Sequence, residues 1–215
     1  MRERRKVLQS KDMLLSECLL EPVLPYPATE DLLEVTREAR VSDKTALIVG
    51  KALFGSFVGP GEAIRLRKHQ AEAVRNHFKR GVQDGRNVVV TSGTGSGKTE
   101  SFLLPTLLRL TEEAQAWGAQ PPPDLWWQGK PEPSKWRPMR AQETRQAAVR
   151  TLILYPTNAL VEDQMTRLRR AVRRIGQDLP SRPLWFGRYT GVSLGSTKPP
   201  TGRGYAFDDV LTQLR

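Results

Sequence analysis

The sequence predicts an α/β fold in which a parallel sheet carries helices on both faces. Two observations support this. A glycine-rich loop joins an apolar run at 87–91 to an amphipathic stretch, and a second apolar run at 149–155 precedes a long amphipathic stretch. Apolar runs that alternate with helical patterns are typical of parallel strands connected by helices. Because only three or four strand candidates are visible, we expect an incomplete sheet.

The chain before the glycine-rich loop is expected to be mainly helical. Residues 31–40 show a short helical pattern, Ser42 can cap a second helix, and a third helix is expected over residues 67–80. Prolines and glycines separate these patterns. We therefore expect an N-terminal extension over residues 1–60 and the α/β lobe over residues 61–215.

After the loop, a helix with a kink at Pro105 is expected. Residues 117–138 are rich in Pro and Trp, which predicts an inserted loop whose tryptophans pin it onto the domain, base stacking being the alternative. Thr157 can cap the long helix after the second apolar run. Residues 183–187 are the third strand candidate. One face of the long helix is basic and carries Arg167, Arg169, Arg170, Arg173 and Arg174.

The glycine-rich loop at 91–99 has the features of a phosphate-binding loop, although Ser92 stands where the plain pattern has its first glycine. Glycines let backbone N–H groups converge on a polyphosphate, and the following helix N-terminus adds unpaired donors. Lys98 is placed to reach the outer phosphates and the Thr99 hydroxyl to ligate Mg²⁺, which makes them the catalytic candidates. The sequence therefore predicts binding of a nucleoside triphosphate rather than a plain Gly/Ser/Thr loop. The expected contacts come from Gly93, Thr94, Gly95, Ser96, Gly97, Lys98, Thr99 and Glu100.

Composition limits the class of protein. Of the 215 residues, 38% are hydrophobic and 27% are charged, with no apolar run long enough for a membrane span and no signal peptide. The single cysteine, Cys18, excludes a disulfide framework and a cysteine-built metal site. We therefore expect a cytoplasmic protein.

The net formal charge of +11 is unevenly distributed. Residues 133–188 carry a net charge of +8, whereas residues 1–45 carry −1. A basic region of this kind indicates a polyanion as partner, and the alternative is a charge excess that serves solubility.

Four segments, taken in order, resemble a superfamily 2 ATPase of the DEAD/DEAH-box helicase kind, in the N-terminal part of its first RecA-like lobe. They are Leu-Arg-Lys-His-Gln at 66–70, the loop at 91–100, Tyr-Pro-Thr-Asn-Ala-Leu-Val-Glu-Asp-Gln at 155–164 and Gly-Arg-Tyr-Thr-Gly at 187–191. The insert and the third segment look closest to large helicases of bacterial phage-defence systems (Druantia and DISARM types) and to Lhr-like enzymes. The resemblance implies a RecA-like P-loop sheet, ATP with Mg²⁺ as cofactors, nucleic acid as partner and proteins of a defence system as further partners.

The resemblance also implies roles for individual residues. Gln70 matches the glutamine that reads adenine, a role that suits an amide able to donate and accept at once, with Phe54 or Phe57 stacking on the ring. The third and fourth segments match motifs that hold the phosphates of one nucleic-acid strand. DNA is favoured over RNA, although backbone contacts do not by themselves distinguish them. The implied strand contacts are Pro156, Thr157, Asn158, Arg188, Thr190 and Gly191.

Two parts of such an ATPase are not recognised in the sequence. Asp208-Asp209 is the acidic pair near the end, but the residues before it do not form a convincing buried strand, so no motif II is assigned. No second lobe is recognised either. We expect the ATP-binding N-terminal portion of a helicase or translocase, with hydrolysis only in a full-length protein. The alternatives are a truncated, catalytically inert nucleic-acid-binding fragment and a P-loop NTPase of another type.

Overall fold

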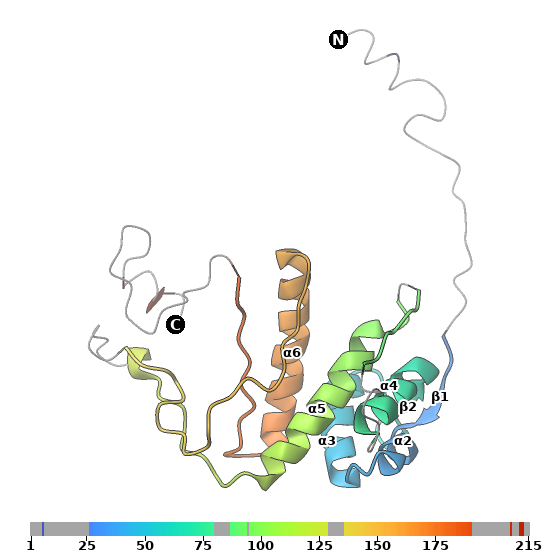
Figure 1. The fold of residues 1–215 in the computed structure, drawn as a ribbon, viewed down its shortest axis with the longest axis horizontal. Helices are drawn as coiled ribbons and strands as arrows, with labels where there is room; N and C mark the ends of the chain where they lie inside the picture. The colour runs from blue at the N-terminus through green and yellow to red at the C-terminus, as the bar shows by residue number, and fades with distance from the viewer. Residues whose placement is uncertain are drawn as a thin grey trace.

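Helices dominate the structure, a computed structural model that describes residues 6, 26–79, 87–93, 95–128, 136–190, 207, 211 and 212. A short antiparallel pair of strands lies at one edge (Figure 1). In chain order the elements are β1 (Ala28–Asp31), α2 (Leu32–Glu38), α3 (Asp43–Phe54), β2 (Arg65–Arg67), α4 (Lys68–Phe78), α5 (Lys98–Ala116), the 3₁₀ turn η1 (Trp126–Gln128) and α6 (Asn158–Asp178).

Side-chain caps begin the first two of these helices. The Asp31 carboxylate accepts a hydrogen bond from the Leu33 N–H of α2 at 2.9 Å, and the Ser42 hydroxyl accepts one from the Thr45 N–H of α3 at 3.2 Å. Each cap satisfies a backbone donor that the first turn leaves unpaired. The predicted helices at 31–40, from Ser42 and at 67–80 are confirmed with ends shifted by one or two residues.

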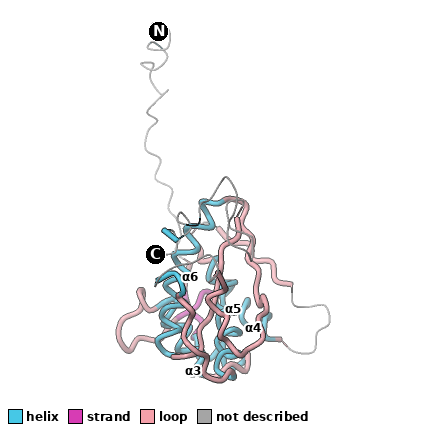
Figure 2. The backbone as a smooth tube through the Cα atoms, turned by 90° about the vertical axis from the view of Figure 1, so that its left-hand side faces the viewer, coloured by secondary structure: helices cyan, strands magenta, loops and turns pink. Residues whose placement is uncertain are grey.

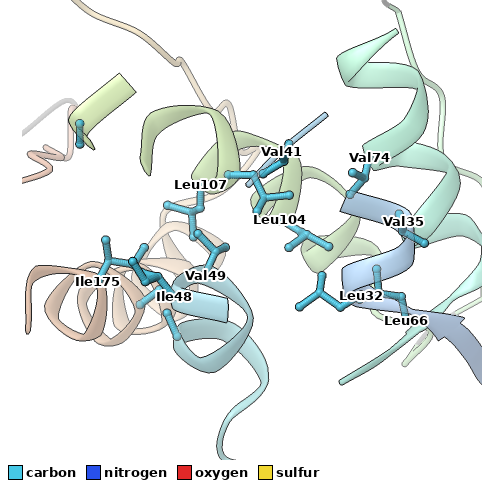
Figure 3. Close-up of a cluster of buried hydrophobic side chains, with 14 of the residues drawn as sticks. Leu32, Val35, Val41, Ile48, Val49, Leu66, Val74, Leu104, Leu107 and Ile175 are labelled. Atoms are coloured by element: carbon cyan, nitrogen blue, oxygen red, sulfur yellow. The ribbon is translucent and has the colours of Figure 1, made fainter. Parts of the chain in front are cut away.

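The hydrophobic core lies among α2, α3, α4, α5 and α6, and α3 packs against both α5 and α6. In Figure 3, Ile48 and Val49 of α3 lie beside Leu107 of α5 and Ile175 of α6. At Gly50 a Cβ atom would lie 2.5 Å from Leu32 Cδ2, so the absence of a side chain at this position lets Leu32 pack directly on α3. The core therefore draws on segments from both sides of residue 60.

The parallel sheet is not observed in the part of the chain that the structure describes, where the β1–β2 pair is the only sheet. The segments predicted as strands at 87–91, 149–155 and 183–187 are extended but unassigned to any strand, and Figure 2 colours them as loop. The exposed fractions of Val89 and Val149 are 86% and 85%, so both residues are almost fully accessible to solvent. A strand is stable only when a neighbour pairs with its backbone, and an apolar run does not specify that neighbour.

An apolar groove of about 690 Å³ lies between α5, α6 and two of these extended segments. Its walls include Leu107 of α5, Val172 of α6, Leu154 and Phe186. At one end of the groove, polar contacts join residues 140–145, which precede the segment at 149–155, to the segment at 183–187. The Glu143 carboxylate accepts hydrogen bonds from the Arg145 and Arg140 guanidiniums, both at 2.9 Å, and from the indole N–H of Trp185.

The Glu143 cluster has an electrostatic consequence. Burial raises the pKa of Glu143, but the hydrogen bonds from Arg145, Trp185 and Arg140 outweigh it and hold the pKa below its usual value. Arg145 also donates to the Pro183 carbonyl at 2.8 Å and stacks over the Trp117 ring at 3.9 Å. This end of the groove is therefore held by charge and hydrogen bonding.

Of the four tryptophans of the insert, Trp117 packs against the main core as predicted, whereas the other three form a small apolar cluster of their own. Trp126 and Trp127 are buried together with Leu211, and Trp136, Met139 and Phe207 pack around them. The Trp126 indole donates to the Arg137 carbonyl at 3.0 Å.

No helix in the described part of the chain has the length and apolar character that a membrane span requires.

Candidate nucleotide-binding loop

The glycine-rich loop takes a backbone shape that glycine alone adopts easily. Gly95 and Gly97 have φ angles of 72° and 77°, in the left-handed region. Gly97 is the residue immediately before α5, and a Cβ atom there would lie 2.5 Å from the Gln70 Nε2 atom. The loop is therefore fitted closely against α4.

Lys98 is the first residue of α5, and its side chain extends across the loop. Its ammonium group donates hydrogen bonds to the Ser92 carbonyl at 2.6 Å and to the Gly93 carbonyl at 3.0 Å. Ser96 lies inside this turn, and its buried hydroxyl has no hydrogen-bond partner among the described residues. A buried hydroxyl without a partner costs free energy unless a ligand or water satisfies it. Thr94 lies outside the described residues.

Gln70 is brought to the loop from α4. Its Oε1 atom accepts from the Arg67 N–H at 3.0 Å, and its Nε2 atom donates to the Gly97 carbonyl at 3.1 Å. The residue is 4% exposed. Each end of the amide keeps one further hydrogen-bonding position, so contact with adenine stays a prediction.

Two residues at this loop were missed by sequence reasoning. Arg67 donates to the Gly95 carbonyl at 2.9 Å, and its guanidinium lies 5.6 Å from the centre of the Tyr26 ring. The Tyr26 hydroxyl in turn covers Gly93, where a Cβ atom would clash with it. The pairing of β1 with β2 brings Tyr26 there, and no spacing in the sequence reports that pairing.

The predicted stacking residues, in contrast, have no contact with the loop among the described interactions. Phe54 is half-buried against the main core, and Phe57 is 84% exposed. Stacking of either ring on a nucleotide stays a prediction.

Glu100 connects the loop to α6. Its Oε1 atom accepts a hydrogen bond from the Arg167 guanidinium at 2.6 Å, across 67 residues of sequence. Its other oxygen would lie 3.2 Å from a Cβ atom at Gly97. The first turn of α5 and the middle of α6 are therefore joined by an ion pair next to the loop.

The start of α6 presents polar groups at the surface. The Thr157 hydroxyl accepts from the Leu160 N–H at 3.5 Å, and Pro156, Thr157 and Asn158 are all exposed. Burial raises the pKa of the preceding Tyr155, whose hydroxyl has no hydrogen-bond partner among the described residues. The unpaired N–H donors of a helix start can bind a phosphate.

The fourth predicted segment lies beside this helix. Arg188 forms an ion pair with Glu162, in the second turn of α6. Thr190 is half-buried, and Gly191 lies outside the described residues. The structure thus brings Arg188 to the helix that begins with Thr157 and Asn158, although Arg188 is paired with a carboxylate.

The arginines of α6 divide into two groups. Arg167 pairs with Glu100, and Arg174 donates to the Ala52 carbonyl and the Ser56 hydroxyl at the C-terminal end of α3, at 3.3 and 3.1 Å. The other three are exposed and have no ion pair in the described part of the chain. They are Arg169, Arg170 and Arg173.

Within the described ranges, no three His, Cys, Asp or Glu side chains lie close enough together to hold a metal ion. Thr99 is half-buried in the first turn of α5, directly after Lys98. Asp208 and Asp209, the acidic pair considered for motif II, lie outside the described residues.

Comparison with known proteins identifies relatives of this chain. The family model described as DEAD/DEAH box helicase matches residues 67–184, which is more than half of the chain. The Druantia protein DruE of Escherichia coli (strain UMEA 4076-1) is 30% identical over 197 residues, which cover 88% of this chain and 9% of that protein. No solved structure gives a significant match.

Proposed function

This chain belongs to the DEAD/DEAH box helicase family, and we propose that it is the ATP-binding portion of an ATP-dependent nucleic-acid helicase or translocase. In this proposal it holds ATP with Mg²⁺ and one strand of nucleic acid, with DNA as the favoured polymer. The family implies a RecA-like P-loop fold. Residues 61–215 are then a partial lobe of that fold with an insert at 117–138, and residues 1–60 are an extension before it.

The observation that carries the proposal is the contact between Gln70 and Gly97. It joins the segment at 66–70 to the loop at 91–100, the first two segments that resemble the family. The contact is made at Gly97, which has a left-handed backbone conformation. The site also fits a polyphosphate: it has a buried Ser96 hydroxyl without a partner, a lysine next to it and a helix start behind it.

Individual residues have defined tasks in this proposal. Lys98 exchanges the carbonyls of Ser92 and Gly93 for the outer phosphates, and the Thr99 hydroxyl is the Mg²⁺ ligand from this chain. Gln70 uses its remaining donor and acceptor for the adenine edge. ATP with Mg²⁺, held by these residues, would supply the free energy for movement along a strand when it is hydrolysed. Hydrolysis requires a motif II carboxylate pair and a second lobe, so it is proposed for a longer protein.

The strand site is proposed at the start of α6. Thr157 and Asn158 offer a hydroxyl, an amide and free N–H groups to backbone phosphates. Arg188 joins them when a phosphate replaces Glu162 as its partner. A place in phage defence, with defence proteins as partners, follows from the similarity to the Druantia protein alone.

Equilibrium binding of a fluorescent ATP analogue with Mg²⁺ tests the nucleotide site. We expect Lys98→Ala to weaken binding by at least about ten-fold, because a charge-assisted contact to the phosphates is lost. Lys44→Ala removes the same charge from an exposed position of α3 and serves as the matched control. Gln70→Ala should abolish the preference for the ATP analogue over the matching GTP analogue. Equal affinity of Lys98→Ala and wild type would refute the proposal.

A second candidate is an inert nucleic-acid-binding fragment, and the exposed Arg169, Arg170 and Arg173 of α6 favour it. Such a fragment binds an oligonucleotide with strong salt dependence and equally well with or without ATP. A P-loop NTPase of another type would instead bind nucleotide without any response to an oligonucleotide.

A further inference from the structure

The ion pair of Arg167 with Glu100 lies at a junction that the proposed function leaves without a role. Glu100 is the third residue of α5, and its side chain is mostly buried, whereas that of Arg167 is half exposed. The two side chains meet at 2.6 Å. The pair is therefore a well-formed contact between the helix of the nucleotide loop and the helix of the strand site.

Glu100 carries a negative charge close to the place proposed for a polyphosphate. Its carboxylate lies against Gly97, with Oε2 placed 3.2 Å from a Cβ atom at that glycine. A carboxylate beside a highly charged anion is repelled by it, and the repulsion is strong where the surroundings exclude water. A nearby cation that pairs with Glu100 would reduce this repulsion.

Arg167 is the cation that does so, and it belongs to α6. Its charge also acts on Tyr155, where it opposes the rise in pKa that burial causes. Tyr155 directly precedes Pro156 and Thr157, the proposed strand contacts. Arg167 is therefore close both to the nucleotide loop and to the segment that leads into α6.

We propose that Arg167 is a positioning residue of the nucleotide site: it keeps the Glu100 carboxylate paired and away from the phosphates, so that nucleotide affinity depends on the position of α6. This inference rests on the proposed function. Because α6 begins at the strand site, a bound strand that fixes α6 strengthens nucleotide binding. By linkage, bound nucleotide strengthens strand binding by the same factor.

A double-mutant cycle on the whole chain tests the compensation of charge, with the fluorescent ATP analogue and Mg²⁺ as the probe. We expect Arg167→Ala to weaken binding by about ten-fold and Glu100→Gln alone to tighten it by about two-fold. The double variant should bind within about three-fold of wild type. A merely structural bridge gives the opposite result, because the double variant lacks the bridge and would stay weak.

Arg109→Ala is the matched control, because it removes an exposed arginine of α5 that has no ion pair among the described residues. It should leave nucleotide affinity unchanged. Thermal melts followed by circular dichroism establish that each variant is folded. A weak double variant, or an Arg167→Ala variant as tight as wild type, would overturn the inference.

The coupling between sites is measured by repeating the titrations with a saturating single-stranded thymidine oligonucleotide. The wild type and Arg109→Ala should bind the ATP analogue about five-fold more tightly with the oligonucleotide, and Arg167→Ala by less than about two-fold. If Lys98→Ala weakens nucleotide binding as the proposed function expects, equal coupling in Arg167→Ala and wild type would contradict this inference and leave the proposed function intact. If wild type binds no nucleotide at all, the proposed function fails first and this inference fails with it.

Discussion

The helical side of the molecule and the side that borders the groove are stabilised in different ways. On the helical side, α2 to α6 bury leucines and valines completely, and each helix satisfies its own backbone hydrogen bonds. On the groove side, the extended segments leave Leu152 and Leu154 exposed, and polar contacts hold this side: the Glu143 cluster and the ion pairs of Arg150 with Glu113 and of Arg188 with Glu162. Apolar burial therefore dominates one side, and charge and hydrogen bonding dominate the other.

The glycine-rich loop lies where these two sides meet. It follows the extended segment at 87–91 and leads into α5, which contributes Leu104 and Leu107 to the core. Its shape is set from the helical side, since Gln70 and Arg67 both donate to its carbonyls. Two of the hydrogen bonds that hold the loop in the described part of the chain therefore come from α4 and the residue before it.

The largest expected difference between the two sides is in how much stability is lost when a leucine side chain is shortened to alanine. Leu104→Ala removes a side chain that is fully buried, and we expect it to lower the free energy of unfolding by about 2–5 kcal/mol. Leu152→Ala removes an exposed side chain of the groove and should change the free energy of unfolding by less than about 0.5 kcal/mol. Urea denaturation followed by circular dichroism measures both. A loss at Leu152 as large as that at Leu104 would show that the groove is filled in solution.

A substitution in the loop should have the next largest effect. Gly97→Ala introduces a Cβ atom at a φ angle of 77° and 2.5 Å from Gln70, so we expect a loss of about 1–3 kcal/mol and of nucleotide-analogue binding. Gly118→Ala is the control, because a Cβ atom there meets nothing within 4 Å. Wild-type binding by Gly97→Ala would contradict the loop geometry described above.

Loss of a helix cap on the helical side should cost less. Ser42→Ala removes the hydroxyl that accepts from the Thr45 N–H, and we expect a loss of about 1 kcal/mol. The effect should appear in the same urea experiment as a lower midpoint with an unchanged slope. A changed slope would instead indicate that α3 can detach from the core separately.

The smallest expected effect is confined to acid pH and to the groove side. Because its pKa is lowered in the folded state, Glu143 stabilises the fold above the usual glutamate pKa, and this contribution is lost as the pH falls below about 4 through the lowered value. Tryptophan fluorescence reports on the Glu143 cluster, since the Trp117 ring lies under Arg145 and the Trp185 indole donates to Glu143. We expect it to change at a higher pH than the helical circular dichroism signal.

Glu143→Gln provides the control for that experiment. It removes the titrating group and should lower stability at neutral pH while flattening the acid dependence of the fluorescence. Coincident acid transitions of fluorescence and circular dichroism in the wild type would show that the two sides unfold together.

Much of the helical side was predictable because helix formation depends on local signals. The caps at Ser42 and Thr157 and the apolar spacing of α5 and α6 placed these helices to within a few residues. The glycines of the loop likewise showed where the chain turns. Tyr26, Arg67 and the partner of Glu100 were not predictable, since each acts on a residue that is far away in the sequence.

The sequence by itself determined the family, the helices and the position of the glycine-rich loop, because these depend on residue types at short and regular spacings. The tertiary structure decided that Gln70 of α4 donates to the Gly97 carbonyl and that Arg167 forms an ion pair with Glu100. It also decided that the apolar runs at 87–91 and 149–155 form no strand pairs among the described residues. A strand pairing or an ion pair needs a specific partner at a specific place. That information arises only when distant segments pack together.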